Sequence, residues 1–277
     1  MNAKLVAVIF LVLAGCEKPA EGEPVARVRV DGKAQANPAP SPSATIASQV
    51  ESACRSIIFE DTPLTHCLAI PARHRITTVL GPQGGAPYRS FAELAKTRDP
   101  ATIAFAMNGG MFDEAGKPIG YFVENSERLK ELNTADGEGN FHLKPNGVFY
   151  GTGDAWEIRT AEDFRDSVGE RPQFGTQSGP MLVIDGRIHP EITQDGPSKL
   201  VRNAVGVDDK GRAHFVISNA PLSFGRLARF YRNELKVKNA LYLDGTVSAL
   251  WNPATGRLDA GAPIGPMILV ERKAAQP

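Results

Sequence analysis

The sequence has 277 residues and carries 31 basic and 31 acidic side chains, so its formal net charge is zero. This balance provides no overall electrostatic field that would recruit nucleic acid, and nucleic acid is therefore not an expected partner. Beyond its first residues the chain is long enough for one large domain or two small ones, because single cores stop growing at about 250–300 residues.

The N-terminus has the order of residues found in a secretory signal. Lys4 is the only early charge, an apolar run covers residues 5–13, and Ala14 and Gly15 lead directly into Cys16. The run is too short to cross a bilayer, which takes about 20 residues. The segment resembles the lipobox of bacterial lipoproteins, which implies cleavage before Cys16 and acylation of that cysteine. We therefore predict a signal peptide at residues 1–15, with an ordinary secretory signal as the alternative.

The residues after the cysteine predict a tether. Glu17 follows Cys16, and by resemblance to the lipoprotein sorting pattern this implies a periplasm-facing protein of the cell envelope, held in the outer membrane by lipid. Residues 16–50 are rich in Ala, Pro, Ser and Glu and contain few large apolar side chains, so they cannot bury enough surface to fold. We expect a disordered tether there, followed by one domain at residues 51–273.

Two further cysteines, Cys54 and Cys67, remain once Cys16 is assigned to lipid. In an oxidising periplasm they are expected to form a disulfide. A turn signal at residues 61–63 lies between them, so the disulfide would join two neighbouring strands. Neither cysteine has a CxxC partner, and the histidines show no HxH or HExxH spacing. The sequence thus predicts no metal site and no cofactor, and it leaves a divalent cation open.

Strand signals dominate the domain. Short β-branched and aromatic runs predict strands at residues 76–80, 103–107, 181–184, 204–207, 214–218, 240–243 and 267–270. Residues 185–186 (DG) and 208–211 (DDKG) predict hairpin turns. Ser90 and Glu93 form a capping box for a short helix through about Thr97, and Ser223 caps a longer one. The pattern predicts an α+β class, with a single domain, a mixed β-sheet core and a few helices.

Four polar, glycine-rich segments border buried strands, where a rigid scaffold presents loops to a ligand. They are residues 107–112 (MNGGMF), 176–183 (TQSGPMLV), 201–206 (VRNAVG) and 242–248 (YLDGTVS). Each has a plain structural interpretation as a turn or a strand entry, because glycine supplies backbone conformations that other residues avoid.

In this order the four segments resemble the phosphodiester glycosidase family, over about residues 54–270. The bacterial branch of that family also carries residues 132–137 (LNTADG) and 141–147 (FHLKPNG). The resemblance implies hydrolysis of a sugar-1-phosphodiester to free sugar and a phosphomonoester, with a carbohydrate or sugar phosphate as substrate. It implies catalytic roles for Asp244, Arg202 and Asn108. The substrate contacts that it implies are Gly109, Gly110, Phe112, Gln177, Ser178, Gly179, Asn203, Gly245 and Ser248.

The expected roles follow from the chemistry of these side chains. The guanidinium of Arg202 is suited to hold a phosphate through two hydrogen bonds. Asp244 would stabilise or attack the developing oxocarbenium centre, or serve as base for water. The leaving phosphate is already an anion, so a strong general acid is less necessary than in glycosidases with two carboxylates. The acid-base partner of Asp244 stays open among Asp136, Glu124 and others.

Two other functions remain as alternatives. Thr246 and Val247 stand where many relatives carry glycines, which indicates an altered substrate or a non-catalytic envelope lipoprotein that binds glycans or phosphoglycans. A serine hydrolase using Ser178 or Ser248 is disfavoured, because neither serine lies in a GxSxG elbow.

Overall fold

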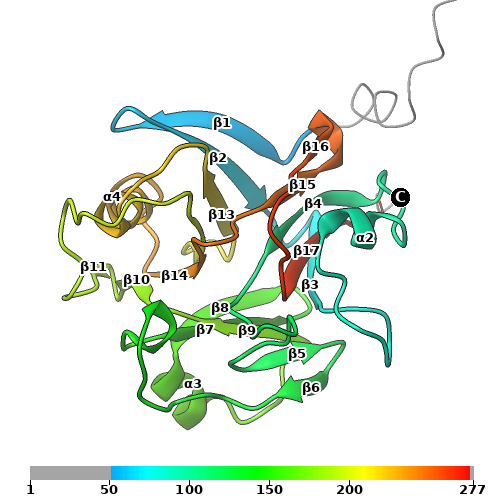
Figure 1. The fold of residues 1–277 in the computed structure, drawn as a ribbon, viewed down its shortest axis with the longest axis horizontal. Coiled ribbons are helices and arrows are strands. Elements are labelled where there is room, and N and C mark those ends of the chain that lie inside the picture. The colour runs from blue at the N-terminus through cyan, green and yellow to red at the C-terminus, as the bar shows by residue number, and fades with distance from the viewer. Residues whose placement is uncertain (1–50, 275–277) are drawn as a thin grey trace, which may run out of the picture. The chain divides into compact units, whose positions relative to one another are not determined.

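The computed structural model describes residues 51–274 (Figure 1). The predicted signal peptide, Cys16 and the predicted tether through residue 50 lie outside the described residues. The described chain forms one body built mainly from three β-sheets with a few short helices at their edges, which confirms the predicted α+β class and sheet core. The strand pairs of these sheets are antiparallel, so the core is shared by three antiparallel sheets.

The first sheet has seven strands, in the order β1-β2-β13-β12-β14-β10-β11. They are β1 (Cys54–Phe59), β2 (Thr62–Ala69), β13 (Ala213–Ser218), β12 (Asn203–Val207), β14 (Asn239–Asp244), β10 (Met181–Ile184) and β11 (Arg187–Ile188). The second sheet has five strands, in the order β16-β15-β4-β17-β3. Its strands are β16 (Arg257–Leu258), β15 (Leu250–Asn252), β4 (Ile103–Asn108), β17 (Met267–Arg272) and β3 (His74–Val79).

The third sheet has the order β6-β5-β9-β7-β8. Its strands are β6 (Glu127–Lys130), β5 (Phe122–Glu124), β9 (Phe174–Ser178), β7 (Gly147–Thr152) and β8 (Ala155–Thr160). All the runs predicted as strands lie on strands of the first two sheets, whereas the third sheet was not predicted. β7 and β9 contain glycines, β6 has only exposed side chains, and β5 is only three residues long, so these strands lack the apolar runs on which the prediction depended.

The helices are short. They are α2 (Phe91–Ala95), α3 (Ala161–Ser167) and α4 (Phe224–Arg229), which continues as the π-helical η2 (Phe230–Glu234); η1 (Asn140–His142) and η3 (Pro253–Thr255) are 3₁₀ turns. Both predicted caps are confirmed, because Ser90 Oγ accepts the Glu93 N–H and Ser223 Oγ accepts the Arg226 N–H, each at 3.2 Å. No helix of residues 51–274 is long and apolar enough to cross a membrane.

Four phenylalanines join the three sheets at the centre. Phe215 of the first sheet lies 5.3 Å from Phe105 of the second and 5.7 Å from Phe149 of the third, measured between ring centroids. Phe149 in turn contacts Phe174 of the same sheet at 5.3 Å. Edge-to-face pairs of this kind add about 0.5–1.5 kcal/mol beyond the area they bury. The sheets are therefore held in a fixed relation, with α3 outside the third sheet (Figure 1).

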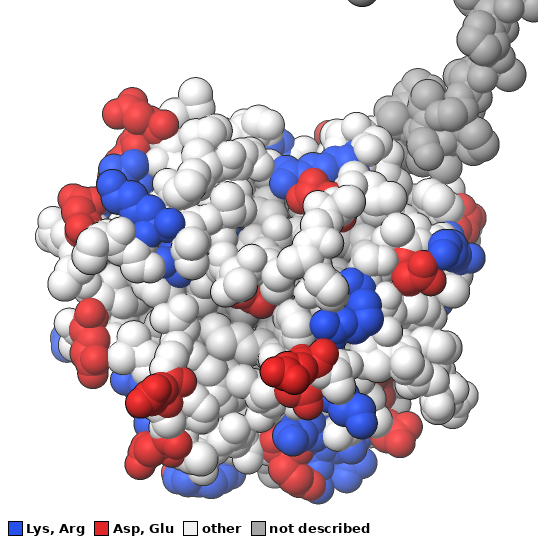
Figure 2. Space-filling view, in the orientation of Figure 1, with Lys and Arg blue, Asp and Glu red and all other residues white. Residues whose placement is uncertain are grey.

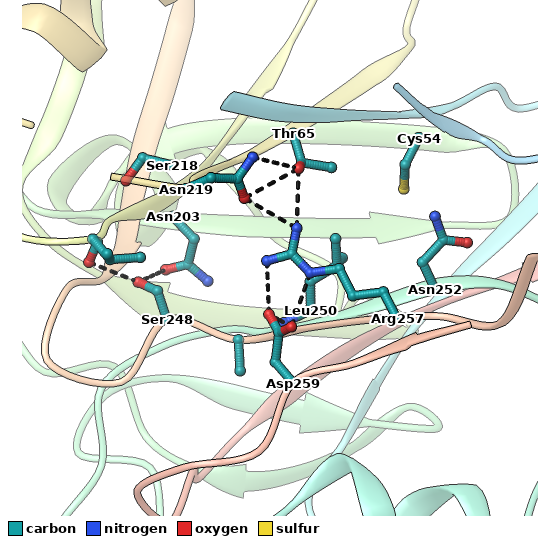
Figure 3. A network of polar contacts seen from close by, with 12 residues as sticks. Cys54, Thr65, Asn203, Ser218, Asn219, Ser248, Leu250, Asn252, Arg257 and Asp259 are labelled. Atoms are coloured by element: carbon teal, nitrogen blue, oxygen red, sulfur yellow. Dashed lines mark hydrogen bonds and ion pairs between the residues drawn. The ribbon is translucent and has the colours of Figure 1, made fainter. Parts of the chain in front are cut away.

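A polar cluster joins the first two sheets at another point (Figure 3). Arg257 on β16 donates to Thr65 Oγ1 at 3.0 Å and to Asn219 Oδ1 at 3.1 Å, near the β2 and β13 edge. Asp259 pairs with the same guanidinium at 2.8 Å and accepts the N–H of Leu250. The segment between β14 and β15 is thereby fixed at its far end.

The predicted disulfide between Cys54 and Cys67 is present and joins directly opposed residues of β1 and β2. The turn between these strands is formed by Glu60 and Asp61, so only Asp61 of the predicted residues 61–63 lies in it, and Thr62 and Pro63 begin β2.

Replacing both cysteines with alanine is expected to lower the free energy of unfolding by about 3 kcal/mol, because the disulfide closes a loop of sequence separation 13 in the unfolded chain. Urea denaturation of the oxidised protein and the double variant measures the difference. Wild-type protein in reductant serves as the matched control and should behave like the variant. Equal midpoints for oxidised and reduced wild type would contradict the prediction.

Candidate functional site

Strand ends from all three sheets meet at one point. Asn203, at the start of β12, donates from Nδ2 to Oδ1 of Asn108, at the end of β4, at 2.8 Å. Ser178, which ends β9, donates to the carbonyl oxygen of Leu243 at 2.9 Å. Leu243 precedes Asp244, which ends β14 and lies opposite Asn203 in the sheet. The four segments singled out in the sequence therefore come together in space.

A cavity of about 540 Å³ opens beside this meeting point. Its walls include Phe112, Tyr242, Asp244 and two residues of the segment around η1, Glu138 and His142. Figure 2 shows that this face of the molecule is hollowed near its middle, among mostly uncharged side chains and with acidic atoms at the floor of the hollow. Concave, largely apolar sites with a few convergent polar groups are the usual form of a ligand pocket.

Asp244 presents one carboxylate oxygen to this cavity. Oδ1 accepts the N–H groups of Gly245, Thr246 and Val247 at 2.6, 2.9 and 3.4 Å, whereas Oδ2 has no hydrogen bond to any residue of 51–274. The side chain is only 6% exposed. Burial raises the pKa of Asp244 above its ordinary value, and the three N–H donors oppose that shift. One oxygen thus anchors the group and the other is available for chemistry.

Arg202 lies beneath the cavity and is fully buried. Nε donates to Leu222 O at 3.0 Å, one terminal nitrogen to the hydroxyl of Tyr242 at 3.1 Å, and the other to Ser198 O and Oγ at 3.1 and 2.9 Å. The guanidinium also stacks on Phe224, with its carbon 3.7 Å from the ring centroid. Its donors face the protein, so Arg202 meets the cavity through Tyr242 and does not lie in the position expected for a direct phosphate contact.

Asn108 carries an unused donor. Its Oδ1 accepts from Asn203 and from the Ala249 N–H at 2.8 Å each, which fixes the orientation of the amide because an N–H must face oxygen. Its Nδ2 is buried and has no partner among the described residues. Buried donors without a partner are uncommon and call for a specific explanation.

Gln177 and Ser178 lie beneath the cavity wall. Gln177 Oε1 accepts the N–H groups of Tyr121 and Asn133 at 2.8 and 2.9 Å, and its Nε2 donates back to Asn133 O at 2.6 Å. The structure therefore places Gln177 as a support for the loop at residues 132–137. Gly179 allows the close approach of the neighbouring loop, since a Cβ there would lie 2.8 Å from Phe141 O.

The other predicted substrate contacts also divide into residues that line the cavity and residues that support the backbone around it. Phe112 lines the cavity, whereas Gly109 packs against Ile268, and Gly110 has φ +102 with its backbone against Thr176. Gly245 leaves room for the hydroxyl of Tyr242. Ser248 Oγ donates to Asp244 O at 2.9 Å and so holds the turn after β14.

Tyr242, Glu138 and His142 were not among the predicted site residues. His142 lies in the 141–147 segment that carried the resemblance, and Tyr242 begins the fourth segment, so the motifs contained both. The two acidic candidates named from sequence lie elsewhere. The Asp136 side chain is 95% exposed and pairs with Lys144, while Glu124 on β5 accepts the Leu80 N–H. Residues 51–274 contain no group of three or more His, Cys, Asp or Glu side chains placed to bind a metal.

Comparisons with known proteins agree with the resemblance seen in the sequence. The sequence pattern of the phosphodiester glycosidase family matches residues 101–271. The uncharacterized protein YigE of Escherichia coli (strain K12) is 39% identical over 182 residues, which are 66% of this chain and 71% of YigE.

A solved structure supports the fold. The catalytic domain of zebrafish N-acetylglucosamine-1-phosphodiester alpha-N-acetylglucosaminidase, auto-inhibited by its pro-peptide, superposes with a TM-score of 0.55. The alignment covers 80% of this chain and 82% of the zebrafish chain at 16% identity, so it speaks for a shared fold alone. With the family pattern matching more than half of its length, the chain belongs to the phosphodiester glycosidase family.

Proposed function

We propose that the protein is a hydrolase that cleaves a sugar from a sugar-1-phosphodiester or a related glycan phosphodiester of the cell envelope. The observation that carries the proposal is the free Oδ2 of Asp244 at a cavity where all four family segments meet. In the proposed setting the protein faces the periplasm and is held in the outer membrane by lipid on Cys16. The sugar and the phosphate side of the substrate are left general.

In the proposed reaction the bond between the anomeric carbon and the bridging oxygen breaks. The bridging oxygen leaves with the phosphate as a phosphomonoester. Water supplies the hydroxyl on the sugar, and its proton passes to a base. Asp244 Oδ2 stabilises or attacks the positive centre that develops at the anomeric carbon. Asn108, whose Nδ2 is buried and which does not line the cavity, would support the site through its hydrogen bond with Asn203, the residue opposite Asp244.

Arg202 acts in this proposal as a positioning residue. It donates to the Tyr242 hydroxyl, so the phenol keeps its own proton for donation. Burial raises the pKa of Tyr242 well above its ordinary value, which keeps the hydroxyl protonated. The guanidinium thus orients a neutral donor at the cavity wall and adds positive charge behind it.

We propose His142 as the base that takes the proton of water. Its Nδ1 lies 3.0 Å from Ala135 O, and because a carbonyl oxygen only accepts, Nδ1 carries the proton. In the neutral ring Nε2 then has the free lone pair. The ring packs against Gly137, where a Cβ would lie 2.7 Å from a ring carbon, so its orientation is fixed.

His142→Gln is expected to lower kcat about a hundredfold with little change in KM, because glutamine keeps the size of the side chain but cannot accept the proton of water. Asp136→Asn, on the same loop but exposed, is the matched control and should keep wild-type kcat. Steady-state kinetics, with the substrate that product analysis shows to be cleaved fastest, measures kcat and KM of both variants. A normal kcat for His142→Gln would remove this residue from the mechanism.

Product analysis tests the activity itself. Full-length protein is incubated with nucleoside-diphosphate sugars and with simple sugar-1-phosphodiesters, and the products are separated by chromatography. Release of free sugar with an equal amount of phosphomonoester supports the proposal. The second candidate is a non-catalytic glycan binder, which Thr246 and Val247 favour because they line the cavity where many relatives have glycines. Binding of a glycan without turnover of any substrate would favour that function.

A further inference from the structure

A second cavity, of about 930 Å³, lies beside β1, β2 and the two ends of the described chain. It shares no lining residue with the cavity at Asp244. Its basic lining residues are Arg55, Arg73, Arg212, Arg272 and Lys273, and its acidic ones are Glu51 and Asp154. We call this cavity the basic groove. Its excess of positive charge contrasts with the neutral balance of the whole chain.

Two of these basic side chains have no partner in the described part of the chain. Lys273 pairs with Asp154, Arg212 pairs with Asp208 at 2.6 Å, and Arg272 donates to backbone oxygens. Arg55 and Arg73 make no side-chain hydrogen bond or ion pair with residues 51–274. A concave surface whose guanidinium groups have no hydrogen-bond partner attracts anions. Phosphate is favoured because the spacing of its oxygens matches the N–H groups of a guanidinium.

A buried chain of hydrogen bonds leads into the same groove. Asp208 Oδ2 lies 3.1 Å from Nε2 of His214, and His214 Nδ1 lies 3.0 Å from Nε2 of His66. All three side chains are nearly buried, with His66 4% exposed, and only His66 lines the groove. The proposed function uses none of these residues.

The order of donors and acceptors determines which ring nitrogens of His214 and His66 carry a proton. The Asp208 carboxylate accepts, so His214 Nε2 carries a proton and His214 Nδ1 is the acceptor. His66 Nε2 must then donate to it. Burial, with His214, Arg55 and Arg212 nearby, lowers the pKa of His66 to about 3, so the ring is neutral. Its Nδ1 therefore holds a lone pair, and this nitrogen has no hydrogen bond to any described residue.

We propose that the basic groove is a second ligand site, which binds a phosphomonoester group as its monoanion. The charged oxygens would meet Arg55 and Arg73, and the P–O–H group would donate to Nδ1 of His66. A sulfate or carboxylate anion offers negative oxygens but no proton for this acceptor at neutral pH. The site thus selects for an anion that is also a donor. It is independent of the proposed function, since the two cavities share no residue.

Calorimetric titration of the full chain tests the site, with inorganic phosphate and sulfate as probes just below neutral pH, where phosphate is mostly its monoanion. Phosphate is expected to bind about tenfold more tightly than sulfate, because only phosphate satisfies His66. In Arg55→Gln and Arg73→Gln each anion should bind about tenfold more weakly. Arg232→Gln is the matched control, because Arg232 is exposed and lies outside the groove.

His66→Asn should abolish the preference for phosphate over sulfate while weak binding of both anions remains. The two arginine variants change only exposed side chains, so they keep the test valid even where His66→Asn fails to fold. Sedimentation with vesicles of phosphatidic acid, whose headgroup is a phosphomonoester, against vesicles of phosphatidylglycerol distinguishes a lipid source from a soluble one. Loss of phosphatidic-acid binding in the arginine variants supports the lipid source. Absence of saturable binding to both phosphate and vesicles, or equal binding by Arg55→Gln, Arg73→Gln and wild type, would overturn the proposal.

Discussion

Replacing Asp244 with asparagine is expected to lower kcat/KM about a thousandfold and to leave the fold intact. The reason lies in how the carboxylate is held. Oδ1 accepts three backbone N–H groups, and an asparagine oxygen can accept the same bonds. The amide nitrogen then takes the place of Oδ2, the oxygen free to stabilise, attack or accept a proton. The substitution thus removes the reactive oxygen Oδ2 and keeps the hydrogen bonds that hold the side chain in place.

Kinetics with the substrate identified by product analysis measure this loss, and circular dichroism checks the fold. Ser248→Ala is a useful comparison, because it removes a hydrogen bond to the backbone of Asp244 without touching the carboxylate, and a much smaller loss is expected. Substantial turnover by a folded Asp244→Asn protein would show that the reaction takes place elsewhere or uses another group.

The contribution of Asp244 to folding stability is expected to depend on pH. Since burial raises the folded-state pKa of Asp244 above 3.8, the folded protein binds more protons than the unfolded chain between these two values. Stability from this group therefore falls as pH rises through that window. Asp244→Asn does not titrate, so it should be more stable than wild type at neutral pH, and the difference should shrink in acid. Activity needs the carboxylate, so the acid limb of kcat/KM should lie above the ordinary pKa of aspartate.

Sequence patterns predicted three of the four strands that end at the site, and they missed β9, which carries Ser178. β4, β12 and β14 are apolar runs next to polar, glycine-rich segments, so both strand and site were visible. The third sheet was missed because β7 has glycines at residues 147 and 151, and β6 has only exposed side chains. Their strand conformation depends on pairing with β9 and β5, which is a tertiary effect that local propensity does not contain.

The sequence also could not predict whether a motif side chain points into the cavity or into the protein. Arg202 borders a strand in a family segment, but its donors turn inward to Tyr242 and to backbone oxygens. Gln177 likewise uses its amide to hold a loop. A motif identifies residues that a fold needs near a site, and only the hydrogen-bond partners show whether a residue faces the ligand or supports one that does. Tyr242 and His142 were added to the candidate site because both line the cavity.

Replacing Arg202 with alanine is expected to lower the free energy of unfolding by about 3–5 kcal/mol. The change leaves a cavity at a fully buried position and removes donors from Leu222 O, Ser198 and the Tyr242 hydroxyl. Lysine is not a conservative replacement, because one ammonium cannot reach all these acceptors or stack as a plane on Phe224. Arg202→Lys should lose most of the same stability in urea denaturation, while Arg232→Lys, on the exposed surface, should lose none.

Kinetics of Arg202→Lys separate a positioning role from direct phosphate binding. If Arg202 positions Tyr242, kcat should fall while KM stays close to wild type, and Tyr242→Phe should lower kcat in the same direction, because both changes disturb one donor at the cavity wall. The two substitutions act through one hydrogen bond, so the double variant should be little worse than Arg202→Lys alone. A folded Arg202→Lys protein of normal stability whose KM alone rises would instead mean that the guanidinium binds the phosphate of the substrate directly.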